Sequence, residues 1–202
     1  MKKFVVIAAT CALFGSATTA LAAGDATAGK AKSTTCAACH SADGNSVNPQ
    51  YPKLAGQSAD YLLKQLQDYK SGARANPIMA GMVAPLSPQD MEDLSAYFAS
   101  QQITRSAADP ALAPAGEAIF RGGNLTSGVS ACMACHGPAG AGNPAAKFPA
   151  VAAQHAEYAE TQLKAFRAME RANDAGQMMR SIAGKMTDME IKAVSSYIQG
   201  LQ

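Results

Sequence analysis

Apolar side chains recur along this chain every three or four positions, which is the spacing that places them on one face of an α-helix. No stretch shows the convincing alternation of apolar and polar residues that a β-strand would require. The pattern therefore predicts an all-α fold. Four stripes carry it: Tyr61, Leu62, Leu66 and Tyr69; Leu94, Tyr97 and Phe98; Tyr158, Leu163 and Phe166; Val194, Tyr197 and Ile198.

Two of these stripes follow clear helix-start signals. The segment Ser87 to Asp90 supplies an N-cap serine, a proline in the first turn and an acid three residues after the cap. Thr187 and Glu190 have the spacing of a capping box. Residues 44–52 and 137–149 are rich in Gly, Pro and Asn, so we predict loops there.

The second half of the chain repeats the first, and this duplication organises the whole sequence. At a spacing of 97 residues, Tyr51 to Gln57 matches Phe148 to Gln154. We therefore expect two complete domains, 23–103 and 115–202, joined by a linker over 104–114. Further matched pairs are Tyr61 and Tyr158, Gln65 and Gln162, Leu66 and Leu163, Tyr69 and Phe166, Met79 and Met179, and Tyr97 and Tyr197.

Residues 1–22 have the three parts of a secretory signal peptide: basic Lys2 and Lys3, an apolar run from Phe4 to about Leu13, and small residues ending at Ala22. We expect cleavage after Ala22, and the apolar run is too short to span a bilayer. Cleavage takes Lys+Arg from 17 to 15 against 15 Asp+Glu, so the mature chain is formally neutral. The charge of the chain therefore gives no argument for nucleic acid or an anionic membrane as a partner.

The candidate chemistry lies in two copies of the pattern C-x-x-C-H, at 36–40 and 132–136. This pattern is typical of covalent attachment of a c-type haem, because the two thiols can reach the two vinyl groups of one porphyrin and the histidine then offers the iron a proximal nitrogen. A redox dithiol, a zinc site and a disulfide within each pair are the alternatives, but none of them needs a histidine directly after the second cysteine in both halves. We therefore predict two haems, attached through Cys36, Cys39, Cys132 and Cys135 and bound at the iron by His40 and His136.

The second axial ligand of each iron has to be chosen among ten methionines. Met79 and Met179 match each other in the duplication and lie ahead of the last helix of their halves, where the chain can cross the other face of a haem. We therefore predict these two as the axial ligands, with Met82 and Met178 as the alternatives. Four methionines align with apolar residues and are expected to pack in the core, namely Met82, Met91, Met178 and Met186.

The remaining expectations concern histidine. Pro52 and Pro149 lie in matching loops after the two motifs. We hypothesise that their carbonyl groups accept the second ring N–H of the proximal histidines and so orient them, with a loop-rigidifying role as the alternative. His155 has no histidine counterpart in the first half, so we expect it to be solvated at the start of a helix rather than to bind iron.

The tandem motifs, the Pro-containing loops, the downstream methionines and the segments P-K-L-A-G-Q, Y-L-L-K-Q-L and S-S-Y-I-Q-G-L resemble the dihaem cytochrome c4 family. The resemblance implies two tandem class I cytochrome c domains related by a pseudo-twofold, with the haems facing each other near the domain interface. It also implies a periplasmic electron carrier of the respiratory chain rather than an enzyme.

The same resemblance implies the partners: a quinol–cytochrome c reductase as donor, and a terminal oxidase or another redox protein as acceptor. It implies a monomer and leaves open a peripheral association with the membrane. Two other functions remain as alternatives. A dihaem peroxidase would need one haem with an open or displaceable ligand, and a dedicated subunit of a dehydrogenase would need a permanent partner.

Overall fold

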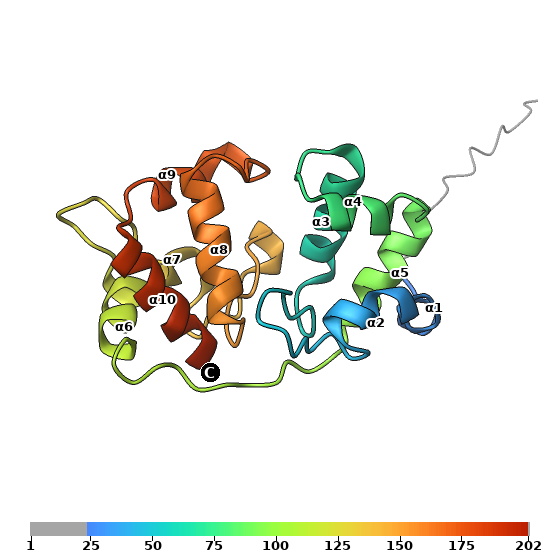
Figure 1. Cartoon of the computed structure of the whole chain (residues 1–202), viewed down its shortest axis with the longest axis horizontal. Coiled ribbons are helices and arrows are strands. Elements are labelled where there is room, and N and C mark those ends of the chain that lie inside the picture. Colours follow the sequence, from blue (N-terminus) through green and yellow to red (C-terminus); the bar gives the residue numbers. More distant parts are fainter. Residues whose placement is uncertain (1–23, 202) are drawn as a thin grey trace, which may run out of the picture.

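The computed structural model describes residues 24–201, so the predicted signal peptide lies outside the described part of the chain. Two helical units are joined by an extended segment (Figure 1). The first unit contains α1 (Ala26–Lys32), α2 (Thr34–His40), α3 (Ala59–Ser71), α4 (Pro77–Val83) and α5 (Pro88–Ala99). The second contains α6 (Ala113–Gly122), α7 (Met133–His136), α8 (Ala156–Arg167), α9 (Met178–Ala183) and α10 (Asp188–Gly200), with short 3-10 turns at Pro144–Ala146 and Ala175–Gln177.

Residues 24–201 contain no β-strand, only isolated bridges between Asn124 and Val129 and between Asn143 and Phe148. The predicted all-α fold is therefore confirmed. Within the same range, no helix is long and apolar enough to cross a membrane.

The first and last helices of each unit cross at a glycine. Helix α1 packs against α5, and α6 packs against α10. A Cβ atom at Gly29 would lie 2.0 Å from the carbonyl oxygen of Asp93, and one at Gly116 would lie 2.2 Å from that of Ala193. Since the interior is already close-packed, any side chain at these positions would push the two helices apart.

The helix starts follow the sequence-based expectations, and so do two of the four methionines expected in the core. Ser87 with Asp90, and Thr187 with Glu190, form capping boxes at the first turns of α5 and α10. The side chains of Met91 and Met186 are buried, as expected for packing residues. The two apolar cores consist of Leu62, Leu94, Tyr97 and Phe98 in the first unit and Phe120, Val129, Met186, Ile191, Val194, Ile198 and Leu201 in the second.

The segment between the units is held by both of them. Residues 102–109 have no regular secondary structure. Lys53 of the first unit donates its ammonium group to the carbonyl of Thr104 at 2.5 Å, and Gln199 of the second donates to the carbonyl of Ala107 at 2.8 Å. Helix α6 begins at Ala113, just inside the expected linker, because Pro114 fits the first turn of a helix, where a missing N–H costs nothing.

The two units meet through contacts that are reciprocal under the duplication. Gln154 of the second unit accepts from the backbone N–H of Lys53 at 2.9 Å and donates to its carbonyl at 3.0 Å. Gln57 of the first unit makes the same two contacts with the backbone of Ala150, at 2.9 and 2.8 Å. A pair of equivalent contacts exchanged between two equivalent surfaces is what a local twofold axis produces.

Candidate functional site

Both C-x-x-C-H motifs lie on a short helix that faces the loop following it. Cys36, Cys39 and His40 belong to α2, whereas Cys132 caps α7 and His136 ends it. The four cysteines of the described range are free and half-buried, so neither pair forms a disulfide. Burial raises the pKa of the Cys36 thiol, and it raises the pKa of the Cys132 thiol to about 11. A raised pKa is the opposite of what a redox-active dithiol needs.

The two histidines of the motifs are buried and point one ring nitrogen at a carbonyl group. The Nδ1 atom of His40 lies 2.9 Å from the carbonyl oxygen of Pro52, and that of His136 lies 2.8 Å from the carbonyl oxygen of Pro149. A carbonyl oxygen can only accept, so Nδ1 carries the proton and Nε2 keeps a lone pair. Burial lowers the pKa of both rings, although the carbonyl contact opposes this, and both imidazoles are therefore neutral. This is the geometry hypothesised from the sequence, and it leaves Nε2 available to a metal.

The predicted axial methionines occupy equivalent places in short helices ahead of the last helix. Met79 lies in α4, and its backbone N–H donates to the side chain of Asn76 at 3.0 Å. Met179 lies in α9, where Asp174 accepts from the backbone N–H and from the guanidinium of the next residue, Arg180, at 3.0 and 2.7 Å. Both methionines are half-buried. The expectation that Met178 packs in the core is wrong, since 42% of its surface is exposed at the first turn of α9.

We expected the His155 side chain to be solvated, but the structure places its ring in a contact with the other unit. Its Nε2 atom lies 2.8 Å from the carbonyl oxygen of Ser46 and 3.0 Å from the hydroxyl of the same residue, which belongs to the other unit. The ring is a contact between the units because the N-terminus of α8 lies against the loop that contains Ser46. Comparison of the two halves could not reveal this contact, because it is present in one half only.

Two buried arginines at the junction escaped the sequence analysis. Arg74 donates to the hydroxyl of Tyr158 at 3.0 Å and to the Oε1 atom of Gln162 at 2.7 Å, both in the other unit. The reciprocal partners of Arg171 are the hydroxyl of Tyr61 at 2.9 Å and the Oε1 atom of Gln65 at 3.3 Å. The two arginines lie 97 residues apart in the sequence, so the duplication itself was the signal that could have found them.

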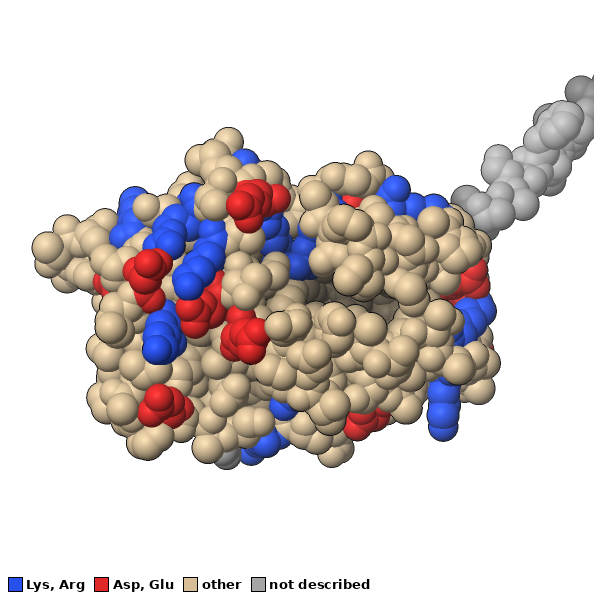
Figure 2. All heavy atoms as spheres, viewed as in Figure 1, with Lys and Arg blue, Asp and Glu red and all other residues tan. Residues whose placement is uncertain are grey.

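The two units differ in the charge of their surfaces, although their candidate haem sites are alike. Charged side chains gather on the second unit in the face shown in Figure 2, while the first unit is mainly uncharged around a hollow close to the junction. Residues 75–89, which include α4, carry no charge. The matching stretch 172–189 contains Asp174, Arg180, Lys185 and Asp188. The two units therefore offer different surfaces to a partner.

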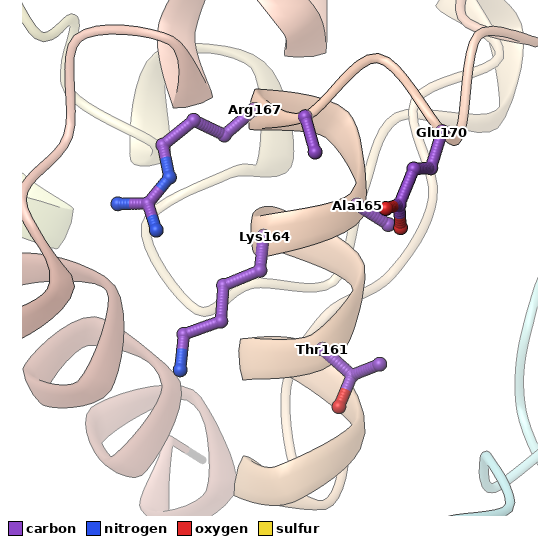
Figure 3. A pocket seen from close by; sticks show the side chains of 6 residues that line it. Thr161, Lys164, Ala165, Arg167 and Glu170 are labelled. Carbon is purple, nitrogen blue, oxygen red and sulfur yellow. The ribbon is translucent and has the colours of Figure 1, made fainter.

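A shallow pocket on the outer side of α8 is lined by Lys164 and Arg167, which extend toward one side of the helix, and by Thr161 and Glu170 (Figure 3). Lys164 is paired with Glu160 at 2.6 Å, and Arg167 is paired with a carboxylate of α10 at 2.5 Å. Because both cations are already neutralised and none of the motif residues lines the pocket, we do not assign it a role.

Comparison with known proteins identifies the family. The family model for cytochrome c matches residues 26–102 and again residues 115–202. Cytochrome c4 of Pseudomonas aeruginosa is 52% identical over 181 residues, which cover 89% of this chain and 90% of that protein. The chain belongs to the dihaem cytochrome c4 family. It is therefore an electron-transfer cytochrome with two tandem cytochrome c domains and two covalently bound c-type haems.

Solved structures agree with this assignment. The crystal structure of reduced recombinant cytochrome c4 from Pseudomonas stutzeri matches this cytochrome with a TM-score of 0.87 at 51% identity, covering 89% of this chain and all of that one (100%). A thiosulfate dehydrogenase electron acceptor of Stutzerimonas stutzeri is 40% identical over 166 residues, which cover 80% of this chain and 76% of that protein. The relatives thus include a protein named as the electron acceptor of a thiosulfate dehydrogenase.

The residues of both sites fit a c-type haem. Each unit offers two unpaired, half-buried thiols for the thioether bonds and one neutral imidazole with a free Nε2 atom. Each also contributes one buried guanidinium at the junction, which suits the carboxylates of a haem. Within residues 24–201, no three His, Cys, Asp or Glu side chains come together as a zinc site would require.

Proposed function

We propose that this cytochrome carries single electrons in the periplasm between a quinol-oxidising complex and a terminal oxidase or another redox protein. The observation that supports the proposal is the equivalence of the two sites: a buried neutral histidine and a half-buried methionine occur at matching places in both units. In this assignment Cys36, Cys39, His40 and Met79 serve one haem. The second haem is served by Cys132, Cys135, His136 and Met179.

The side chains contribute to electron transfer by keeping the same orientation in both oxidation states of the iron. His40 is fixed by the carbonyl of Pro52, so its Nε2 lone pair keeps one direction in both oxidation states. Met79 supplies a thioether, which is neutral and favours the reduced form of an iron centre. The haem supplies the one-electron couple. With His40 and Met79 as the two protein ligands of the iron, no coordination position would be left for oxygen or peroxide.

The predicted signal peptide supports the periplasmic location, since c-type haems are attached outside the cytoplasm in this interpretation. A neutral mature chain favours short-lived docking through a small surface rather than a permanent complex. The uncharged surface of residues 75–89, which include Met79, is the surface we propose for such docking, with the quinol–cytochrome c reductase and the oxidase as partners. We propose that the protein is a monomer.

The ligand assignment is tested by replacing one methionine at a time. Met79→His should lower the midpoint potential of one haem and leave the other nearly unchanged, because imidazole stabilises the oxidised iron more than a thioether does. Met179→His should do the same to the other haem. Each change should also remove half of the absorbance band at the red edge of the spectrum that Met–Fe(III) bonding produces.

Met82→Leu and Met178→Leu are the matched controls, and both should keep the band. If Met79→His keeps the full band but Met82→Leu loses half of it, the ligand of the first unit has been assigned wrongly. The peroxidase alternative is tested on the unchanged protein: turnover of peroxide, or a high-spin optical band in either oxidation state, would favour an enzyme.

A second candidate function is supported by the thiosulfate dehydrogenase electron acceptor among the relatives. The same two haems could accept electrons from a thiosulfate-oxidising enzyme instead of a quinol-oxidising complex. Reduction rates measured with each of the two donors separate these possibilities, since the physiological donor should reduce the protein faster and with a rate that saturates.

A further inference from the structure

Each proline carbonyl group that faces a motif histidine belongs to a peptide group that is hydrogen-bonded on its other side as well. In the first unit this is the peptide group between Pro52 and Lys53. Its carbonyl oxygen lies 2.9 Å from Nδ1 of His40, and its N–H donates to the Oε1 atom of Gln154 at 2.9 Å. Gln154 belongs to the second unit, so a single peptide group connects the histidine of one unit to a side chain of the other.

The second unit has the same series of contacts with the roles of the units exchanged. The peptide group here is the one between Pro149 and Ala150. Its carbonyl oxygen lies 2.8 Å from Nδ1 of His136, and its N–H donates to the Oε1 atom of Gln57 at 2.9 Å. Gln57 belongs to the first unit, between α2 and α3. Since the series occurs twice at matching positions of the two halves, it belongs to the way the units meet rather than to one particular loop.

Both glutamine side chains are held with the oxygen facing the peptide N–H, which can only donate. The Nε2 atom of Gln154 donates to the carbonyl group of Lys53 at 3.0 Å, and that of Gln57 donates to the carbonyl group of Ala150 at 2.8 Å. Each Oε1 atom also accepts from the backbone N–H of the residue that follows its glutamine, at 3.0 Å in both units. Three hydrogen bonds thus fix the position of each acceptor oxygen.

The surroundings of these peptide groups make the contacts strong. His40, His136 and Lys53 are all less than 10% exposed, at 7%, 9% and 5%. Hydrogen bonds in series polarise one another, and they do so most where water is excluded. The glutamine oxygen therefore makes the proline carbonyl group a stronger acceptor. A stronger acceptor at Nδ1–H leaves more electron density on the Nε2 atom of the same ring.

We propose that Gln57 and Gln154 are positioning residues that act crosswise, each lowering the midpoint potential of the haem in the opposite unit. The proposal rests on the ligand set above, in which the Nε2 atoms of His40 and His136 bind the two irons. Greater electron density on that nitrogen stabilises the oxidised iron, so each glutamine favours the oxidised state of one haem. Gln154 acts on the haem of the first unit, and Gln57 acts on that of the second.

Potentiometric titration of glutamine variants of the holoprotein tests the proposal. Gln154→Met keeps the length of the side chain but removes its acceptor oxygen, so it should raise the potential of the haem in the first unit and leave the other nearly unchanged. Gln57→Met should raise the potential of the haem in the second unit only. Combining each change with Met79→His, which displaces the potential of the first unit's haem, shows which haem has shifted.

Gln199→Met is the matched control. The side chain of Gln199 also joins two backbone groups, since it accepts from the N–H of Ala156 at 3.0 Å and donates to the carbonyl group of Ala107 at 2.8 Å. Neither group belongs to a peptide that faces a motif histidine. This variant should therefore shift neither potential beyond the experimental error.

Proton NMR of the reduced holoprotein gives a readout that does not depend on the potentials. Gln154→Met should move the Nδ1–H resonance of His40 upfield and speed its exchange with solvent, because its hydrogen bond is weakened. The resonance of His136 should stay where it is. Gln57→Met should have the converse effect on the two histidines.

The proposal is overturned if a glutamine variant shifts the haem of its own unit, both haems equally, or neither. Equal shifts are the result expected of a junction that is merely loosened. Gln154→Glu covers the case in which Gln154→Met does not fold. Its carboxylate still accepts from the N–H of Lys53, and more strongly, so the potential of the first unit's haem should fall, and by more than that of the other. A rise, or equal shifts of both haems, would contradict the proposal.

The same samples keep this outcome separate from that of the proposed function. Variants that retain low-spin spectra and two one-electron steps, but lack the crosswise shifts, would leave the electron-carrier function standing. The role of the two glutamines alone would then be wrong.

Discussion

At the scale of single residues, a carbonyl oxygen determines which nitrogen of each proximal histidine is free. The contacts of Nδ1 with Pro52 and Pro149 are 2.9 and 2.8 Å long, in a buried environment that keeps both rings neutral. The proline contributes its carbonyl group and the fixed φ angle of its loop, and its missing N–H costs nothing there. Two equivalent loops thus orient in the same way the two histidines that we propose as iron ligands.

This contact predicts slow exchange of two ring protons. In the reduced, diamagnetic holoprotein, NMR should show Nδ1–H signals of His40 and His136 that exchange with solvent far more slowly than those of a free imidazole, because each proton is buried and bonded. His155 is the control: it is more exposed and should exchange faster. Fast exchange at either proximal histidine would contradict the hydrogen bond to proline.

Site residues could be predicted from the sequence where they belong to a motif or to an apolar helix face. The histidines, the cysteines and the hypothesised proline contacts belong to this group, because spacing within one short segment decides them. Arg74 and Arg171 could not be found in that way. Their role depends on which surfaces of the two units meet, and neither a propensity nor a local pattern encodes that.

At the scale of helices, the glycine crossings set the geometry of each unit. Gly29→Ala and Gly116→Ala should each destabilise the holoprotein, because the added Cβ would overlap a carbonyl oxygen of the facing helix, at 2.0 and 2.2 Å. Overpacking of this kind costs about 1–3 kcal/mol. Denaturant unfolding measures the loss.

Gly122→Ala is the matched control in the same helix as Gly116, since a Cβ there meets nothing within 4 Å. It should leave stability unchanged or raise it by a few tenths of a kcal/mol, through the better helix propensity of alanine. If the control costs as much as Gly116→Ala, the close crossing is not what requires glycine.

Helix α1 is also tied to α5 by an ion pair that the second unit lacks. Lys32 donates to Asp93 at 2.7 Å, and Asp93 also accepts from the backbone of Asp25 and the side chain of Gln89, both at 2.9 Å. The contact with Lys32, followed by those with Asp25 and Gln89, lowers the pKa of Asp93 to about 2. The matching position in the second unit is Ala193, so this anchor is confined to the first.

A lowered folded-state pKa makes this anchor dependent on pH. An unfolded aspartate has a pKa of about 3.9, so the stabilisation is present above about pH 4 and is lost as the pH falls toward about 2. Unfolding free energies of the wild type and of Asp93→Asn should therefore converge over that range. A constant difference between the two proteins down to pH 2 would contradict the ion pair.

At the scale of the whole molecule, two similar units are joined by a polar and reciprocal junction. The side chain of Gln57 is hydrogen-bonded to the backbone of the second unit, and that of Gln154 to the backbone of the first. Arg74 and Arg171 lie in the buried part of the junction. Residues 102–109 are hydrogen-bonded to both units. Duplication predicted that two domains exist and what each contains. It could not predict how they meet, because residues at the contact are polar and carry no periodic signal.

The two units also differ in the charge of their solvent-exposed surfaces, despite the duplication. The first unit presents an uncharged stretch over 75–89, and the second presents both signs of charge over the matching residues. Since the proposed iron ligands match while their surroundings differ, we expect two haems of similar ligation but different potential. Electrons can then enter through one unit and leave through the other.

The central claim is that both haems are held by one histidine and one methionine each and do nothing but exchange electrons. Potentiometric titration of the purified holoprotein with optical readout tests it most directly. We predict two one-electron steps, low-spin spectra throughout, and a red-edge Met–Fe(III) band whose intensity accounts for both oxidised haems. A high-spin signal, or a band that accounts for one haem only, would contradict the account.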